Sequence, residues 1–169
     1  MEDIQTKIEF KPETLKEIDR IIKQFPEGKQ KSALLRVLHL AQNEFGNWLS
    51  VDVMDYVARL LHLNPIEVYE VASFYSMYNL KKVGKVVIEV CRTGPCCLVG
   101  AEKILGYIEN KLNIKPGETT EDGMFTLKAV ECLGACGYGP MFQIGETYYE
   151  NLTEEKVDDL LNDFRLKFN

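Results

Sequence analysis

The segment Lys85-Val-Val-Ile-Glu-Val-Cys91-Arg-Thr-Gly-Pro-Cys96 carries the clearest structural signal of the chain. Its first half is rich in β-branched residues and alternates Val86, Ile88 and Val90 with Lys85, Val87 and Glu89. This period of two predicts a strand with one buried face. The strand leads directly into Cys91, so we expect a cysteine loop at its carboxyl end.

The same arrangement recurs downstream. Residues 124–130 form a second predicted strand, and Cys132 follows shortly after its end. Apolar residues between the two strands predict a helix over about 97–112; they are Leu98, Ala101, Leu105, Ile108 and Leu112. Residues 141–144 and 147–149 predict a hairpin, whose Gly145-Glu146 turn has Gly first, as a type II′ turn requires. A final helix is expected after Thr153 as N-cap, with Leu152 and Val157 as a hydrophobic staple.

Residues 14–78 have a helical period throughout and predict four helices. The turn at 25–28 ends the first, residues 31–45 form the second, and Ser50 is the expected N-cap of the third. Asn64-Pro65 opens a fourth helix over about 65–77. Apolar residues surround this helix instead of forming one stripe, which predicts burial on several sides or contact with another chain. The order is four helices, then βαββ and a helix.

Composition excludes several classes of protein. The chain has 169 residues, is 46% hydrophobic and 27% charged, and contains no apolar run long enough to cross a membrane. We therefore predict a globular protein without direct membrane insertion. The net charge of -6 gives little reason to expect nucleic acid as a partner. Residues 1–5 match neither a secretory signal nor a transit peptide, so we expect a cytoplasmic protein whose thiols stay reduced.

All five cysteines lie between positions 91 and 136, and four of them form the pairs Cys91-x4-Cys96 and Cys132-x3-Cys136. A 2Fe-2S cluster requires four thiolates, two on each iron, so two pairs on two loops match that need. Glycines in these loops would let the backbone curl around a cluster, accept positive φ and point N–H groups at sulfur; they are Gly94, Gly134, Gly137 and Gly139.

Other interpretations of the cysteines remain open on spacing alone. Structural zinc also takes four cysteines, although its usual spacing is shorter. A redox dithiol would need C-x-x-C, and a disulfide framework belongs to small secreted chains. Ordinary buried cysteines would not cluster in glycine-rich loops. Cys97 could replace Cys96 as a ligand, whereas His39 and His62 lie far from the cysteines and pair with no other ligand at chelating spacing.

These residues resemble a known family, the thioredoxin-like 2Fe-2S subunit of NADH:quinone oxidoreductase, which is the 24-kilodalton subunit of complex I. The resemblance rests on Cys91-Arg-Thr-Gly-Pro-Cys96, Leu98 to Glu102, Val130-Glu-Cys-Leu-Gly-Ala-Cys136-Gly and Gly139-Pro-Met141. It extends upstream through Ala41-Gln42, Gly46 to Leu49, Val68 to Tyr75 and Asn79-Leu80. It therefore covers nearly the whole chain.

The resemblance implies the ligands and the fold. The ligand positions of the family map onto Cys91, Cys96, Cys132 and Cys136, and Cys97 falls on a position that is not a ligand. The implied fold is α+β: an N-terminal helical bundle, residues 1–80, followed by a thioredoxin-like α/β domain with a mixed sheet, residues 81–169. Because its fourth helix is apolar on all sides, we expect the helical region to dock a partner.

The resemblance also implies a function and partners. The chain would be an electron-transfer subunit with one 2Fe-2S cluster and no hydride-transfer site of its own. Its expected partner is a flavoprotein subunit that binds FMN and NAD(H), together with further iron-sulfur subunits. The parent enzyme would be a complex I-like dehydrogenase, peripheral to the inner membrane, or a bifurcating hydrogenase or formate dehydrogenase. A freestanding thioredoxin-like ferredoxin and a structural zinc adaptor are the alternatives.

Overall fold

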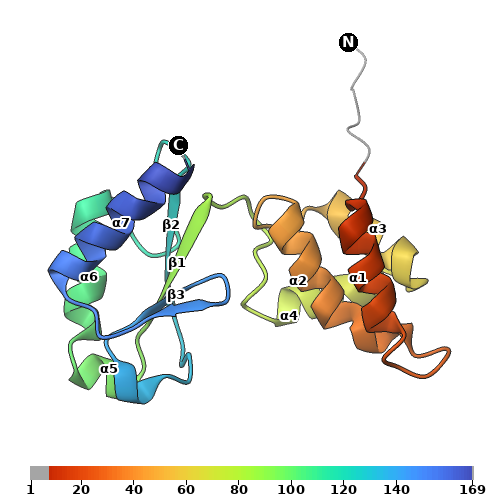
Figure 1. Cartoon of the computed structure of the whole chain (residues 1–169), viewed down its shortest axis with the longest axis horizontal. Helices are drawn as coiled ribbons and strands as arrows, with labels where there is room; N and C mark the ends of the chain where they lie inside the picture. The colour runs from red at the N-terminus through yellow and green to blue at the C-terminus, as the bar shows by residue number, and fades with distance from the viewer. Residues whose placement is uncertain (1–7, 169) are drawn as a thin grey trace, which may run out of the picture. The chain divides into compact units, whose positions relative to one another are not determined.

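The computed structural model describes residues 8–168 and divides the chain into two compact units, one ending at Lys82 and the other beginning at Val83 (Figure 1). The prediction that the chain lacks a leader concerns residues 1–5, which lie outside the described part. No helix within residues 8–168 has both the length and the apolar character needed to cross a bilayer.

The first unit contains α-helices and one 3-10 helix. They are α1 (Pro12–Ile22), the 3-10 helix η1 (Gln30–Ala33), α2 (Leu34–Glu44), α3 (Val51–Leu61) and α4 (Pro65–Phe74). The sequence predicts one helix over 31–45, but its first turn is the tighter η1. Helix α4 ends three residues earlier than predicted, because Tyr75 has extended backbone angles, φ −90 and ψ 113.

The predicted caps of α3 and α4 are confirmed. The Ser50 hydroxyl accepts a hydrogen bond from the Val53 N–H at 3.2 Å. Asn64 and Glu67 form a capping box, and Pro65 occupies the first turn. His62 is the C-cap of α3 and adopts a left-handed conformation with φ 53.

The core of this unit gathers apolar side chains from all four α-helices. Its most deeply buried members include Ile18, Val37, Leu38, Val57 and Val68. Tyr78 lies at the edge of this core, where its hydroxyl donates to the Leu35 carbonyl at 2.8 Å. Phe10, Leu49 and Tyr78, which lie outside the helices, complete the same core.

The second unit places helices against a four-stranded sheet. Its elements are β1 (Val86–Cys91), α5 (Gly94–Leu98), α6 (Ala101–Leu112), β2 (Phe125–Val130), the 3-10 helix η2 (Cys136–Tyr138), β3 (Phe142–Ile144), β4 (Thr147–Tyr149) and α7 (Glu154–Phe168). The sheet order is β2-β1-β3-β4; β1 and β2 are parallel and the other pairs antiparallel. The sheet is mixed, as expected.

The predicted helix over 97–112 is two helices. Gly100 takes φ +100 between α5 and α6, which interrupts the right-handed helical path. Helix α5 begins at Gly94, so Cys96 lies on a helical turn and not in an open loop. Strands β1 and β2 each begin one residue later than predicted, and β1 includes Cys91.

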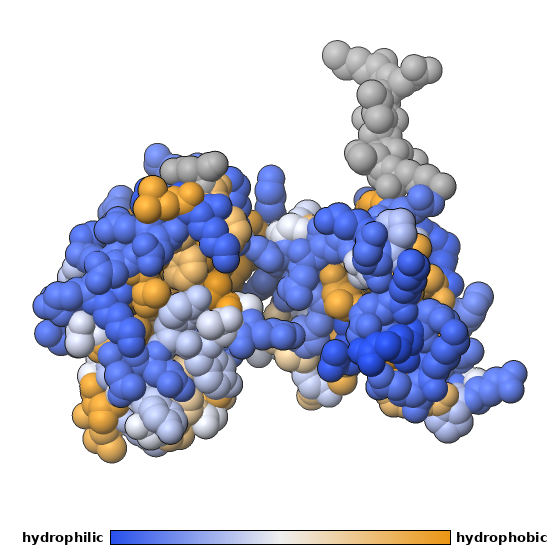
Figure 2. Space-filling view, viewed as in Figure 1, coloured by the Kyte–Doolittle hydropathy of each residue, from blue (hydrophilic) through white to orange (hydrophobic). Residues whose placement is uncertain are grey.

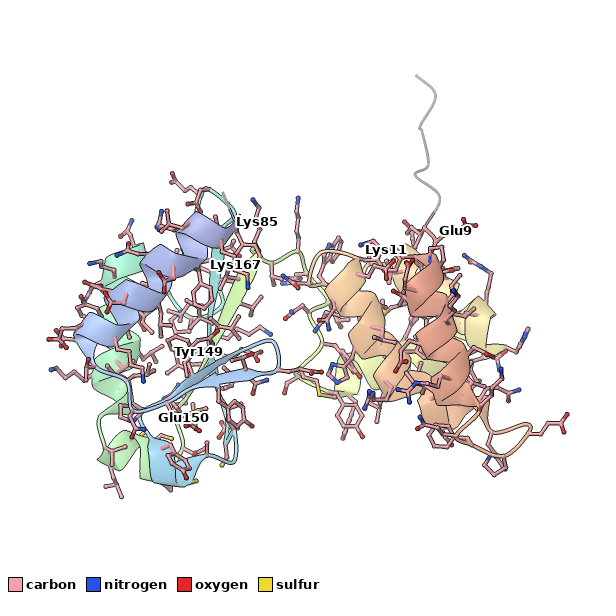
Figure 3. The ribbon with its side chains drawn as sticks, viewed as in Figure 1. Glu9, Lys11, Lys85, Tyr149, Glu150 and Lys167 are labelled. Atoms are coloured by element: carbon pink, nitrogen blue, oxygen red, sulfur yellow. The ribbon has the colours of Figure 1, made fainter. Side chains whose placement is uncertain are left out.

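The sheet, α6 and α7 share one core. It contains Val86, Ile88 and Val90 of β1, which confirms the predicted alternation, with Ile108 and Leu161 of the two helices among its other members. The Thr153 hydroxyl accepts from the Lys156 N–H at 3.2 Å, as its predicted cap role requires. Tyr149, labelled in Figure 3, packs its ring 5.3 Å from that of Phe142 and 5.6 Å from that of Phe164. The hairpin thereby contacts the final helix.

Candidate metal centre

Strand pairing determines where the two cysteine loops lie. Strands β1 and β2 are adjacent and parallel, and Cys91 stands in register with Val130. The Arg92 N–H continues the ladder by donating to the Val130 carbonyl at 3.0 Å. Because parallel strands end at the same edge of a sheet, the segments that carry Cys96 and Cys132 both leave from this edge.

The four predicted ligands form one buried pair and one exposed pair. Cys91 and Cys96 are 2% and 1% exposed and lie in a small apolar cluster with Ala101 and Met141. Cys132 and Cys136 are exposed. Within residues 8–168, no three side chains of metal-binding type come close enough to hold a single metal ion. The thiols interact as two pairs, Cys91 with Cys96 and Cys132 with Cys136.

The pKa values of these thiols reflect their crowding. Burial, together with the nearby Cys91 thiol, raises the pKa of Cys96 to about 11. The hydrogen bond with Cys132 and the charge of that thiol raise the pKa of Cys136. Two thiolates in each pair repel each other, and iron would offset this repulsion because its positive charge stabilises coordinated thiolates. The donor set therefore fits a cationic sulfur-bound centre.

Cys91 behaves differently from its neighbours. Burial raises the pKa of its thiol, but hydrogen bonds from the Thr93 hydroxyl, the Thr93 N–H and the Leu133 N–H outweigh that effect and lower the pKa. Three hydrogen-bond donors of the protein are thus directed at the sulfur of Cys91. The Leu133 donor comes from the segment that carries Cys132, so each cysteine segment contacts the other.

Two of the four glycines singled out in the sequence have a visible reason to be glycine. Gly134 takes φ +80, and its N–H donates to the Cys132 sulfur at 3.4 Å, as predicted. A Cβ on Gly139 would lie 3.3 Å from the Cys96 sulfur and 2.9 Å from Cγ2 of Val99. Gly94 and Gly137 have neither a positive φ nor a close neighbour.

The remaining candidate ligands lie elsewhere. The Cys97 thiol donates to the Arg92 carbonyl at 3.2 Å, so it closes the turn that follows β1. The His39 ring packs against that of Tyr78 in the first unit, with the ring centroids 5.1 Å apart. His62 is exposed at the end of α3. The histidines and the cysteines therefore belong to different units of the chain.

Sequence reasoning missed two residues that hold the cysteine segments. The Thr93 hydroxyl lies 3.4 Å from the Cys91 sulfur. The Tyr148 hydroxyl on β4 donates to the Leu133 carbonyl at 2.5 Å and so ties the second cysteine segment to the hairpin. Thr93 could have been noticed, because it lies inside the first cysteine motif. Tyr148 could not, because only the folded hairpin brings it there.

Two thiol pairs beside the carboxyl ends of two adjacent parallel strands define a candidate sulfur-ligated metal centre. A sequence model of the thioredoxin-like 2Fe-2S ferredoxin family matches residues 18–165, and the chain belongs to this family. It therefore holds one 2Fe-2S cluster and transfers electrons. The predicted α+β fold and the predicted cofactor are both confirmed.

Relatives extend the similarity to nearly the whole chain. The E subunit of NADH-quinone oxidoreductase from Rickettsia felis is 47% identical over 165 residues, which cover 98% of this chain and 99% of the relative. NADH dehydrogenase (ubiquinone) flavoprotein 2, mitochondrial, of Dictyostelium discoideum is 41% identical over 95% of this chain and 65% of its own length.

A solved structure supports the fold. The crystal structure of a NAD+-reducing NiFe hydrogenase in its H2-reduced state superposes with a TM-score of 0.70 at 19% identity. The match covers 81% of this chain and 23% of the hydrogenase chain, so the present chain spans about a quarter of that chain's length. At this level of identity, the match demonstrates a shared fold.

Proposed function

We propose that Cys91, Cys96, Cys132 and Cys136 bind the 2Fe-2S cluster, and that the chain passes single electrons between this cluster and a partner subunit that binds FMN and oxidises NAD(P)H. The observation that carries the ligand assignment is the pairing of the thiols at the common edge of β1 and β2. Cys97 is the fifth thiol, and its hydrogen bond to the Arg92 carbonyl leaves it a structural role.

The chain's residues give the cluster site two unlike sides. Cys91 and Cys96 are buried, so the protein would shield from water an iron held by this pair, whereas Cys132 and Cys136 are exposed. When bound, a 2Fe-2S cluster supplies a one-electron couple. A flavin can accept a hydride and release its two electrons one at a time, so a flavin-binding partner would link hydride chemistry to this carrier. The exposed pair marks the side that a partner can approach.

The surface beside the site is apolar. Figure 2 shows hydrophobic side chains where α5 reaches the surface, and Leu98 there is 90% exposed. Tyr138, on η2 beside Cys136, is also exposed. Apolar contacts of this kind suit a protein partner that must bring its own redox centre close to the cluster.

The helical unit, residues 1–80, is proposed as a docking region for the flavoprotein. Helix α4 buries Val68 and Ala72 but leaves Ile66 60% and Phe74 79% exposed. A diffusing ferredoxin would need only the second unit, whereas the oxidoreductase relative from Rickettsia felis matches over 98% of this chain. The relative's name supports an NADH-quinone oxidoreductase as the parent complex.

Anaerobic purification tests the ligand assignment. The chain should contain two irons and two acid-labile sulfides, as its family requires, and should accept one electron. Cys136→Ala should lose the cluster while Cys97→Ala retains it. A colourless protein that contains zinc and no sulfide would exclude the proposed function and favour a structural adaptor.

Co-expression with the candidate flavoprotein subunit of the same organism tests the partner. The two chains should co-purify, and NADH should then reduce the cluster. Phe74→Glu should weaken the association, whereas Leu166→Glu, an equally polar change at an exposed site of α7, should not. If the loaded chain stays monomeric beside its flavoprotein, it is a freestanding carrier instead.

A further inference from the structure

Thr93 occupies an unusual position between the two buried cysteines. It is the N-cap of α5, with φ −86 and ψ 165, and its carbonyl accepts the Cys97 N–H at 3.0 Å. A threonine at an N-cap usually accepts a hydrogen bond from the second or third N–H of its helix. Here the Thr93 side chain makes no capping hydrogen bond. Its hydroxyl lies 3.4 Å from the Cys91 sulfur.

The local sequence explains why the hydroxyl is available. Pro95 is the second residue of α5, so one of the two donors that a capping hydroxyl could use does not exist. The backbone of Thr93 is fixed by its own hydrogen bond to Cys97 and does not depend on the side chain. The hydroxyl is therefore directed to sulfur by a backbone that would stay in place without it.

Coordination determines the direction of this hydrogen bond. A cysteine sulfur bound to iron carries no proton, so it can only accept. The Thr93 hydroxyl must then be the donor. Since Cys91 is 2% exposed, water has little access to take over this bond if the hydroxyl is removed.

We infer that Thr93 is a positioning residue that raises the reduction potential of the cluster by donating a hydrogen bond to the Cys91 sulfur. Reduction adds one negative charge, which spreads in part onto the coordinating sulfurs. A hydrogen bond to sulfur consequently stabilises the reduced cluster more than the oxidised cluster, and such bonds are among the determinants of cluster potential. This inference rests on the proposed ligand set.

Three substitutions separate the effect of the Thr93 hydroxyl from the effect of side-chain size. Thr93→Val keeps the size and branching of the side chain but removes the donor, and Thr93→Ser keeps the donor. Thr147→Val makes the same chemical change on β4, where Thr147 is exposed. All are made in the full chain with its cluster loaded, and iron and sulfide are counted before any potential is measured.

The reduction potential is measured by a redox titration in which EPR monitors the reduced cluster. Thr93→Val should make reduction less favourable by about three- to tenfold in the equilibrium constant, where tenfold is about 59 mV for a one-electron couple. Thr93→Ser and Thr147→Val should stay near the wild-type potential. The tuning role would be refuted if the reduction potential of Thr93→Val equals that of the wild type, or if Thr93→Ser shifts the potential as much as Thr93→Val does.

Loss of the cluster from the variants would also be decisive. If Thr93→Val does not load, Thr93→Ala takes its place, since it removes the donor without adding an apolar branch. If neither variant binds iron, Thr93 serves assembly and not tuning, and the inference is wrong. A wild-type protein without iron and sulfide would instead refute the proposed function, so the two failures are distinguishable.

Discussion

Gly139→Ala should disturb the cluster site through Cys96. The added Cβ would lie 2.9 Å from Cγ2 of Val99 and 3.3 Å from the Cys96 sulfur, both closer than an ordinary contact of about 3.5–4.0 Å. Val99 is half exposed and can turn away, but Cys96 is buried. We therefore expect Gly139→Ala to lower the free energy of unfolding by about 1 kcal/mol, near the lower end of the range typical of overpacking, and to displace the Cys96 sulfur.

Two assays follow this change. Urea unfolding measures the free energy of unfolding, and iron and sulfide analysis measures loading after identical anaerobic reconstitution. Gly106→Ala is the matched control: it lies inside α6, and no atom lies within 4 Å of its added Cβ. It should load normally and gain roughly 0.5–1 kcal/mol from helix propensity. If Gly139→Ala matches the wild type in both assays, the proposed close contact with Cys96 is wrong.

Three further changes test other parts of the structure. Gly84→Ala should destabilise the second unit by about 3 kcal/mol, because its Cβ would lie 2.8 Å from the Met124 carbonyl oxygen, which is backbone and cannot rotate away; unchanged urea unfolding would contradict this. Burial raises the pKa of Tyr78 well above its usual value, so folding favours the protonated phenol. The contribution of the protonated Tyr78 to the free energy of unfolding is complete below the unfolded-state pKa of about 10 and decreases as the pH rises further. Between about pH 8 and pH 11, Tyr78→Phe should therefore lose less free energy of unfolding than the wild type. Cys97→Ala should leave the iron content and the EPR spectrum of the reduced cluster unchanged, since its thiol contacts the Arg92 carbonyl; loss of iron would reassign the ligands.

Much of the local structure could be predicted because its signals are local. The alternation of Val86, Ile88 and Val90 identifies β1 and its buried face, and Ser50, Asn64 and Thr153 mark helix starts through hydrogen bonds that span only three residues. The ends of helices and strands were predicted less accurately. The left-handed Gly100 divides a continuous apolar pattern into two helices, and glycine in a helical pattern does not by itself indicate which conformation it adopts.

The sequence by itself determined the class of protein, because two thiol pairs inside a recognisable motif restrict the chemistry to a sulfur-bound metal centre. Only the tertiary structure decided how the thiols differ. Strand pairing brings the Leu133 N–H to Cys91 and places Gly139 against Cys96, contacts between residues about forty positions apart. Burial and hydrogen bonding depend on such distant contacts, so the chain's spacing could identify the ligands as candidates but could not show which sulfur is buried, which is exposed and which receives the Thr93 hydroxyl.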